Sequence, residues 1–163
     1  MILISILICS AAIHISYILQ LKETPYISHP LIDAEVYHQK ALNILNSGWI
    51  GEKIFFQAPL YPYLLAIIYS QLGPIIENVI WIQAICSVFN VYLIFCLGRN
   101  LFDVETGLAS AGLALFYGGF VLYSAFLLKA TFSILFTCLF LLFFLQSSKF
   151  PSFNCYFKTG LFL

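Results

Sequence analysis

The sequence has very little charge. Only 9% of its 163 residues are Asp, Glu, Lys or Arg, whereas 62% are hydrophobic, and the formal net charge is zero. A chain this apolar cannot stay soluble as one small globule, which excludes a soluble enzyme. Its few basic residues are scattered, so there is no positive patch for nucleic acid and no polybasic patch for anionic lipid. We expect an integral membrane protein that lies in a lipid bilayer and binds no nucleic acid.

The motifs of common soluble chemistries are also missing. The sequence contains no P-loop, dinucleotide fingerprint, HExxH motif or nucleophile elbow, and Gly118-Gly119 lacks the spacing of a phosphate cradle. The five cysteines include no CxxC pair and have no His at ligand spacing. We interpret them as packed or lipid-facing thiols, not as metal ligands or disulfides, and predict no metal site built by the protein.

Long apolar runs are abundant instead. About 20 mainly apolar residues cross the hydrocarbon core as a helix. The first run lacks a preceding Lys or Arg and a following cleavage site, so we interpret it as an uncleaved span and not as a signal peptide. The spans expected from these runs cover residues 1–21, 75–97, 105–126 and 130–147. His14 lies within the first span, where an ionisable residue is expected to face the protein interior.

A shorter apolar stretch runs from Pro59 to Leu72. It is too short to span, and two prolines occupy its first turn, so it predicts an interfacial or re-entrant helix. Its tyrosines, Tyr61, Tyr63 and Tyr69, are of the type that sits at the level of lipid headgroups.

One polar segment, residues 22–57, holds four of the seven acidic residues. Within it, Asp33–Ser47 predicts an amphipathic helix that ends at Gly48 and lies with its apolar stripe on the membrane surface. Asp33 takes the N-cap position and Glu35 the first turn, where both carboxylates favour the positive end of the helix dipole. Capping alone explains both acids. The functional alternative is a carboxylate that accepts a proton from a substrate hydroxyl or binds a cation.

Three further polar residues allow two interpretations each. His29 and His38 are either partners of these acids or solvated side chains. Lys129, between two expected spans, either extends to the membrane interface or attracts a phosphate.

The order of these features resembles a known family. Asp33-x-x-x-Tyr37-x-x-x-Ala41 follows the first span, Gly48-Trp49-Ile50-Gly51 and Ala58-Pro59-Leu60-Tyr61-Pro62 come next, and Gln83 lies in the following span. From about Leu21 to Leu145 the chain is similar to the dolichyl-phosphate-mannose protein mannosyltransferase-like glycosyltransferases of the GT-C class.

That resemblance implies a fold and an activity. The fold is an all-α polytopic membrane protein of about four transmembrane helices, a single domain over residues 1–163, with surface helices in a first extracytoplasmic loop at residues 22–74. The N-terminus would be intracellular, and the bacterial cytoplasmic membrane is expected in preference to the endoplasmic reticulum. The activity is transfer of a sugar, with inversion, from a polyprenyl-phosphate carrier to a hydroxyl of an acceptor protein or glycolipid.

The resemblance also assigns roles to residues. Asp33 corresponds to the catalytic base and Glu35 to a second carboxylate, which orients the acceptor or holds a cation; whether a divalent cation is a cofactor stays open. The expected substrate contacts are Tyr37, His38, Pro59, Tyr61 and Lys129.

Two departures from the family keep a rival interpretation open. Many relatives carry an acidic residue just after the lysine that follows the third span, but here Ala130 follows Lys129. Relatives are also longer, so we expect an N-terminal fragment of a longer enzyme. The rival is a non-catalytic small membrane protein or an inactive remnant, in which Asp33 only caps a helix.

Overall fold

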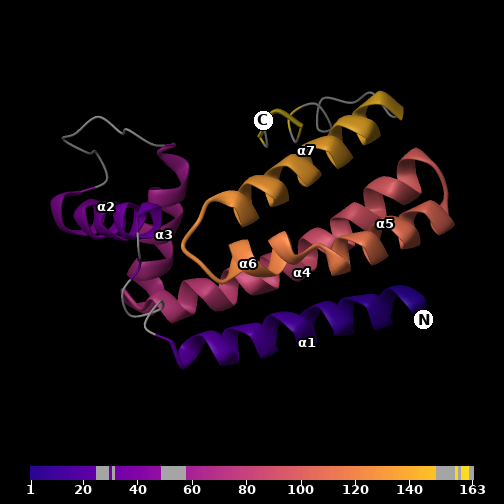
Figure 1. The fold of residues 1–163 in the computed structure, drawn as a ribbon. Helices are drawn as coiled ribbons and strands as arrows, with labels where there is room; N and C mark the ends of the chain where they lie inside the picture. The colour runs from indigo at the N-terminus through magenta and orange to yellow at the C-terminus, as the bar shows by residue number, and fades with distance from the viewer. Residues whose placement is uncertain (25–29, 31, 49–57, 150–156, 158, 162–163) are drawn as a thin grey trace.

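The computed structural model describes residues 1–24, 30, 32–48, 58–149, 157 and 159–161, and all regular structure in these ranges is helical (Figure 1). The helices are α1 (Ile2–Lys22), α2 (Asp33–Ser47), α3 (Leu60–Leu72), α4 (Ile76–Leu101), α5 (Val104–Phe116), α6 (Gly118–Ser124) and α7 (Ala130–Lys149). α1, α4 and α7 are long and apolar enough to cross a membrane, and α5 with α6 forms a fourth candidate if the bent pair is one span. The predicted all-α polytopic membrane protein is thus confirmed.

α4 is the central helix of the bundle. It packs against α1, α5, α6 and α7, and it also touches α3. Figure 1 shows α2 and α3 together at one end of this bundle, with the N-terminus at the other end. The part of the predicted polar segment that forms α2 therefore lies at a single end of the molecule.

Two glycines let α4 and α5 approach closely. A Cβ atom added at Gly98 would lie 2.9 Å from the Cα of Gly107, and one added at Gly107 would lie 2.8 Å from the carbonyl oxygen of Phe95. Small residues at such a crossing allow membrane helices to pack through their backbones.

The expected span over residues 105–126 is not one helix. It breaks at Tyr117, and α5 and α6 meet there at a bend of 57°. Tyr117 has an extended backbone, with φ −76° and ψ 98°, and Gly118-Gly119 follows it. One span was predicted because both halves are apolar and their summed length suits one span, although Gly118-Gly119 interrupts the apolar run.

Polar side chains of α4 bind the backbone of α6, of α7 and of the connection between them. Gln83, Ser87 and Asn90 are all fully buried, and their spacing of four and three residues places them on one face of the helix. They donate hydrogen bonds of 2.7–3.1 Å to carbonyl oxygens of the α6–α7 region, those of Phe120, Ser124, Phe126 and Thr131. Non-helical backbone at membrane depth needs such partners, because no water is available there.

Candidate active site at the end of the bundle

α2 is held on α3 through its apolar face. The predicted helix bounds are confirmed, and the buried residues of α2 are Ala34, Tyr37, Ala41 and Ile44. The predicted location of this face is wrong: it packs against α3 and not on the membrane surface. An isolated amphipathic pattern does not reveal whether lipid or protein covers it, and here the aromatic rings of α3 do so.

Asp33 is the first residue of α2 and its side chain is exposed. The predicted N-cap role is corrected by one residue, because Ile32 occupies the cap position with φ 53° and ψ −114°. A positive φ is unusual for a β-branched residue. Asp33 still lies in the first turn, where its carboxylate favours the positive end of the helix dipole.

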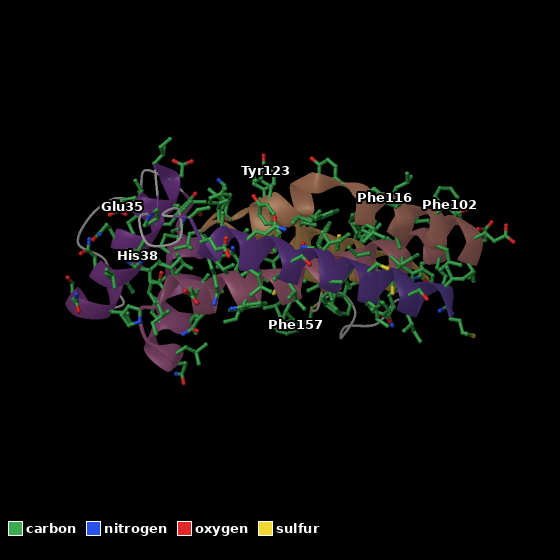
Figure 2. The ribbon with its side chains drawn as sticks, turned by 60° about the horizontal axis from the view of Figure 1, so that its bottom comes forward. Glu35, His38, Phe102, Phe116, Tyr123 and Phe157 are labelled. Atoms are coloured by element: carbon green, nitrogen blue, oxygen red, sulfur yellow. The ribbon has the colours of Figure 1, made fainter. Side chains whose placement is uncertain are left out.

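Glu35 lies in the same turn and is half-buried. Its Oε1 accepts a hydrogen bond of 2.9 Å from Nε2 of Gln39, one turn further along α2. Figure 2 shows Glu35 and His38 at the α2–α3 end, far from Phe102 at the other end of the bundle. The two acids are thus presented by one short, rigidly packed helix.

A tyrosine network fixes the contact between α2, α3 and α4. The rings of Tyr37 and Tyr61 meet edge to face, with centroids 4.9 Å apart and an interplanar angle of 86°. Oη of Tyr61 donates a hydrogen bond of 2.6 Å to Oε1 of Gln83. Burial raises the pKa of Tyr61 well above its usual range, and burial and the Asp33 carboxylate raise the pKa of Tyr37. Both phenols therefore remain neutral at physiological pH.

Two of the three tyrosines expected at the headgroup level are buried within the protein. Tyr61 and Tyr69 are each 2% exposed, and Tyr63 is half-buried. The predicted substrate contacts Tyr37 and Tyr61 are thus core residues, positioned to hold α2 in place. Pro59 is exposed at the N-cap of α3.

His38 is not a solvated side chain. It is half-buried, and a hydrogen bond of 2.8 Å joins its Nδ1 to Oη of Tyr69. Burial raises the pKa of Tyr69 far above its usual range, so the phenol keeps its proton. The alternative partner, His29, lies outside the described residues.

A polar cavity opens beside His38. Its volume is about 420 Å³, and its polar lining comes from Lys22, Thr24, His38 and Glu77, with the 74–76 turn completing the wall. Nζ of Lys22 lies 2.7 Å from Oε2 of Glu77. The cavity thus joins the last residue of α1, the first turn of α4 and the middle of α2.

Lys129 lies at the same end, just before α7, and is exposed. The first turn of α7, which follows Lys129, contacts α3, where the ring centroids of Tyr61 and Phe132 lie 6.0 Å apart. No group of three or more His, Cys, Asp or Glu residues within the described ranges could hold a metal ion.

His14 faces the protein interior, as its position in the first span predicts. It is 3% exposed. Its Nδ1 donates to the carbonyl oxygen of Ser10 at 2.8 Å, and its Nε2 lies 2.9 Å from Oγ of Ser87. It therefore ties α1 to α4 and takes no part in the polar cavity.

The sequence did not reveal the pairs Lys22–Glu77 and His38–Tyr69, because each joins helices far apart in the chain. A signal did exist for the polar face of α4. Gln83, Ser87 and Asn90 recur at helical spacing in an otherwise apolar span, and polar residues in that setting face other protein groups.

Comparison with known proteins identifies the family. The family model described as dolichyl-phosphate-mannose-protein mannosyltransferase matches residues 57–163, which include α3 to α7 but not the acids of α2. Neither the search of curated proteins nor that of solved structures gives a match. Because the matched region is well over half of the chain and includes helices α3 to α7 of the bundle described above, the chain belongs to the dolichyl-phosphate-mannose-protein mannosyltransferase family.

Proposed function

We propose that this membrane protein transfers a sugar, with inversion, from a polyprenyl-phosphate carrier to an acceptor hydroxyl, with Asp33 as the general base. Family membership supports a mannosyltransferase-like activity. The observation that carries the assignment of the base is the placement of an exposed carboxylate at the start of α2, whose other face is buried on α3.

The reaction needs few groups. The acceptor oxygen attacks the anomeric carbon while its proton passes to an Oδ of Asp33. The bond between the anomeric carbon and the carrier's phosphate oxygen breaks, and its electron pair leaves with the phosphate. Glu35, steadied by Gln39, orients the acceptor hydroxyl through a second hydrogen bond. Cationic side chains at this end, Lys22 and Lys129 among them, stabilise the departing phosphate.

Rigidity of α2 matters to this proposal. A base contributes only when it is within hydrogen-bond distance of the proton that it removes. The Tyr37–Tyr61 contact and the Tyr61–Gln83 hydrogen bond connect α2 to α3 and α3 to α4. Asp33 is thereby held at a fixed height relative to the membrane spans.

The test is Asp33→Asn, with Asp103→Asn as its matched control. Asp103 is also exposed, but it caps α5, accepts a hydrogen bond of 2.7 Å from the Thr106 amide, and lies next to Phe102 at the far end (Figure 2). Asparagine caps helices well, so the control tests loss of an acid without loss of a cap. We expect Asp33→Asn to lower mannose transfer from polyprenyl-phosphate mannose by about two to four orders of magnitude.

Transfer is measured in membranes that hold equal amounts of each variant. Wild-type rates in Asp33→Asn would show that the base assignment is wrong and would favour the rival, in which the acid serves only the helix. An equal loss in Asp103→Asn would trace the effect to charge or folding and not to chemistry.

A further inference from the structure

The seam between α1 and α4 carries a second cavity. This apolar groove has a volume of about 460 Å³. Its wall includes Leu7, Ala11 and Ile15 of α1 and Trp81, Ile85 and Phe89 of α4. Both this α1–α4 groove and the polar cavity have volumes in the range of small-molecule sites, about 300–1,000 Å³.

The groove and the polar cavity follow one another along the same helix faces. Ile15 and Lys22 are seven residues apart on α1, and Trp81 and Glu77 are four apart on α4, so each pair shares a face. They meet where Nζ of Lys22 lies 5.8 Å from the centroid of the Trp81 ring. From Leu7 to Lys22 the seam is about 22 Å long.

His14 also lines the groove, but its ring nitrogens are directed to Ser10 and Ser87. The groove therefore offers hydrocarbon and aromatic surface, while the cavity at its end offers an ammonium, a carboxylate, a hydroxyl and an imidazole. A molecule that fills both must have a hydrocarbon tail and an anionic, hydrogen-bonding head.

We propose that this seam binds the carrier, with the phosphate at Lys22, the sugar against Glu77 and His38, and the first isoprene units in the α1–α4 groove. The inference rests on the proposed function and specifies where its donor lies. His38 belongs to α2, as does Asp33, and the two residues are five apart, about 7.5 Å along the helix axis and about 140° around it. This proximity to the proposed base is what favours the sugar carrier over a bulk phospholipid.

An exchange of partners makes room for the head. The side chains of Lys22 and Glu77 are 35% and 45% exposed, and exposed ion pairs stabilise proteins very little. A phosphate can take the Lys22 ammonium at little cost, which leaves the Glu77 carboxylate to accept hydrogen bonds from sugar hydroxyls. The tail adds positioning and not affinity, because the bilayer is as apolar as the groove. Selectivity must therefore come from the head.

The test uses the 163-residue chain in phosphatidylcholine nanodiscs with a farnesyl phosphate that carries a diazirine on its tail. Farnesol and phosphatidylcholine with the same diazirine serve as comparison probes. We expect labelled peptides from α1 and α4, with farnesyl phosphate labelling them about tenfold more than either comparison probe, as for loss of one charge-assisted hydrogen bond. Equal labelling by phosphatidylcholine would overturn the proposal, since the groove would then be filled by bulk lipid.

Two variants break the same ion pair with different expected results. Lys22→Gln removes the ligand of the phosphate and should abolish the preference for farnesyl phosphate over farnesol. Glu77→Gln also breaks the ion pair but keeps the ammonium, so the preference should persist. The same loss in both variants, or in neither, would refute a phosphate site at Lys22.

A matched pair tests the groove. Ala11 lines it, whereas Ala12, its neighbour on α1, is exposed and does not. Ala11→Leu should reduce labelling about tenfold by overfilling the groove, and Ala12→Leu should leave it unchanged. Val88→Phe, which fills the groove from α4, repeats the test if Ala11→Leu does not insert. Equal labelling of the wild type and the filling variants would overturn the groove assignment.

Asp33→Asn separates this inference from the proposed function. Because Asp33 does not line the seam, this variant should be labelled like the wild type. Normal labelling with normal transfer in Asp33→Asn refutes the base and leaves the carrier site intact. If Asp33→Asn impairs transfer but the seam of the wild type is not labelled, the carrier site alone is refuted.

Discussion

Replacement of Gln83 by leucine tests whether the polar face of α4 holds the end of the bundle together. The side chain is 0% exposed. Its Nε2 donates to the carbonyl oxygens of Ser124 and Phe126, at 3.0 and 2.7 Å, and its Oε1 accepts from Tyr61. Leucine has nearly the same volume, so Gln83→Leu removes three hydrogen bonds without leaving a cavity.

The expected cost follows from these three bonds. Hydrogen bonds within membrane proteins contribute about 0.6 kcal/mol on average, and up to about 1.7 kcal/mol, by double-mutant cycles. Buried groups left without any partner cost about 1–3 kcal/mol each. We therefore expect Gln83→Leu to lower the free energy of unfolding by about 2–5 kcal/mol. Tyr61→Phe removes one of the three bonds and should cost about 1–2 kcal/mol.

The measurement is reversible unfolding in mixed micelles, titrated with a denaturing detergent. Gln71 on α3 is exposed, so Gln71→Leu controls for the loss of an amide at the same end. The double variant, Tyr61→Phe with Gln83→Leu, contains neither the phenol nor the amide, so neither group is left without its partner. The combined cost should therefore be smaller than the sum of the two single costs by about 1 kcal/mol. A Gln83→Leu protein as stable as the Gln71→Leu control would refute this account of the α4 face.

Two further predictions concern packing and pH. Gly107→Ala should cost about 1–3 kcal/mol, because its methyl group meets α4 backbone, while Gly112→Ala, whose added Cβ meets nothing within 4 Å, should be neutral or slightly stabilising; equal costs for both in the same detergent titration would contradict the close α4–α5 crossing. The pKa of both Tyr61 and Tyr69 is raised in the folded state, so the unfolded chain loses these protons first as the pH passes about 10. Above that pH the free energy of unfolding should fall by up to about 1.4 kcal/mol per pH unit for each tyrosine. Tyr69→Phe should make this fall with pH less steep. An equally steep fall in Tyr69→Phe would show that Tyr69 ionises in the folded protein.

The sequence predicted those elements that depend on local pattern. Apolar run length located α1, α4 and α7 to within a few residues, and the helical period with Gly48 as its stop located α2 from Asp33 to Ser47. Such features need only the chain's own composition and turn preferences.

The features that the sequence did not predict all involve a partner elsewhere in the chain. The irregular connection between α6 and α7 depends on the Gln83 side chain of α4, which binds the carbonyl oxygens of Ser124 and Phe126. The apolar face of α2 is covered by aromatic side chains of α3. Apolar residues at helical spacing indicate that one face of a helix is buried, but not which surface covers it. The membrane surface was therefore predicted to cover α2, whereas α3 covers it.

The candidate site divides in the same way. Asp33 and Glu35 were predicted from their position at a helix start and from resemblance to a family, and their role in the site stays a prediction. In the structure Asp33 is exposed and Glu35 is half-buried. The polar cavity was not foreseen. It arises only when Lys22, His38 and Glu77 are brought together from three helices, and no spacing in the sequence connects them.

The hydrogen bonds between α4 and the α6–α7 region also bear on how the protein is assembled during translation. α4 precedes that region in the chain, so the donors of Gln83, Ser87 and Asn90 have already been synthesised when the carbonyls that need them emerge from the ribosome. A broken segment enters a bilayer poorly by itself, because its free peptide groups have no partner in lipid. With this order of synthesis, α4 is available to bind the α6–α7 region as that region folds.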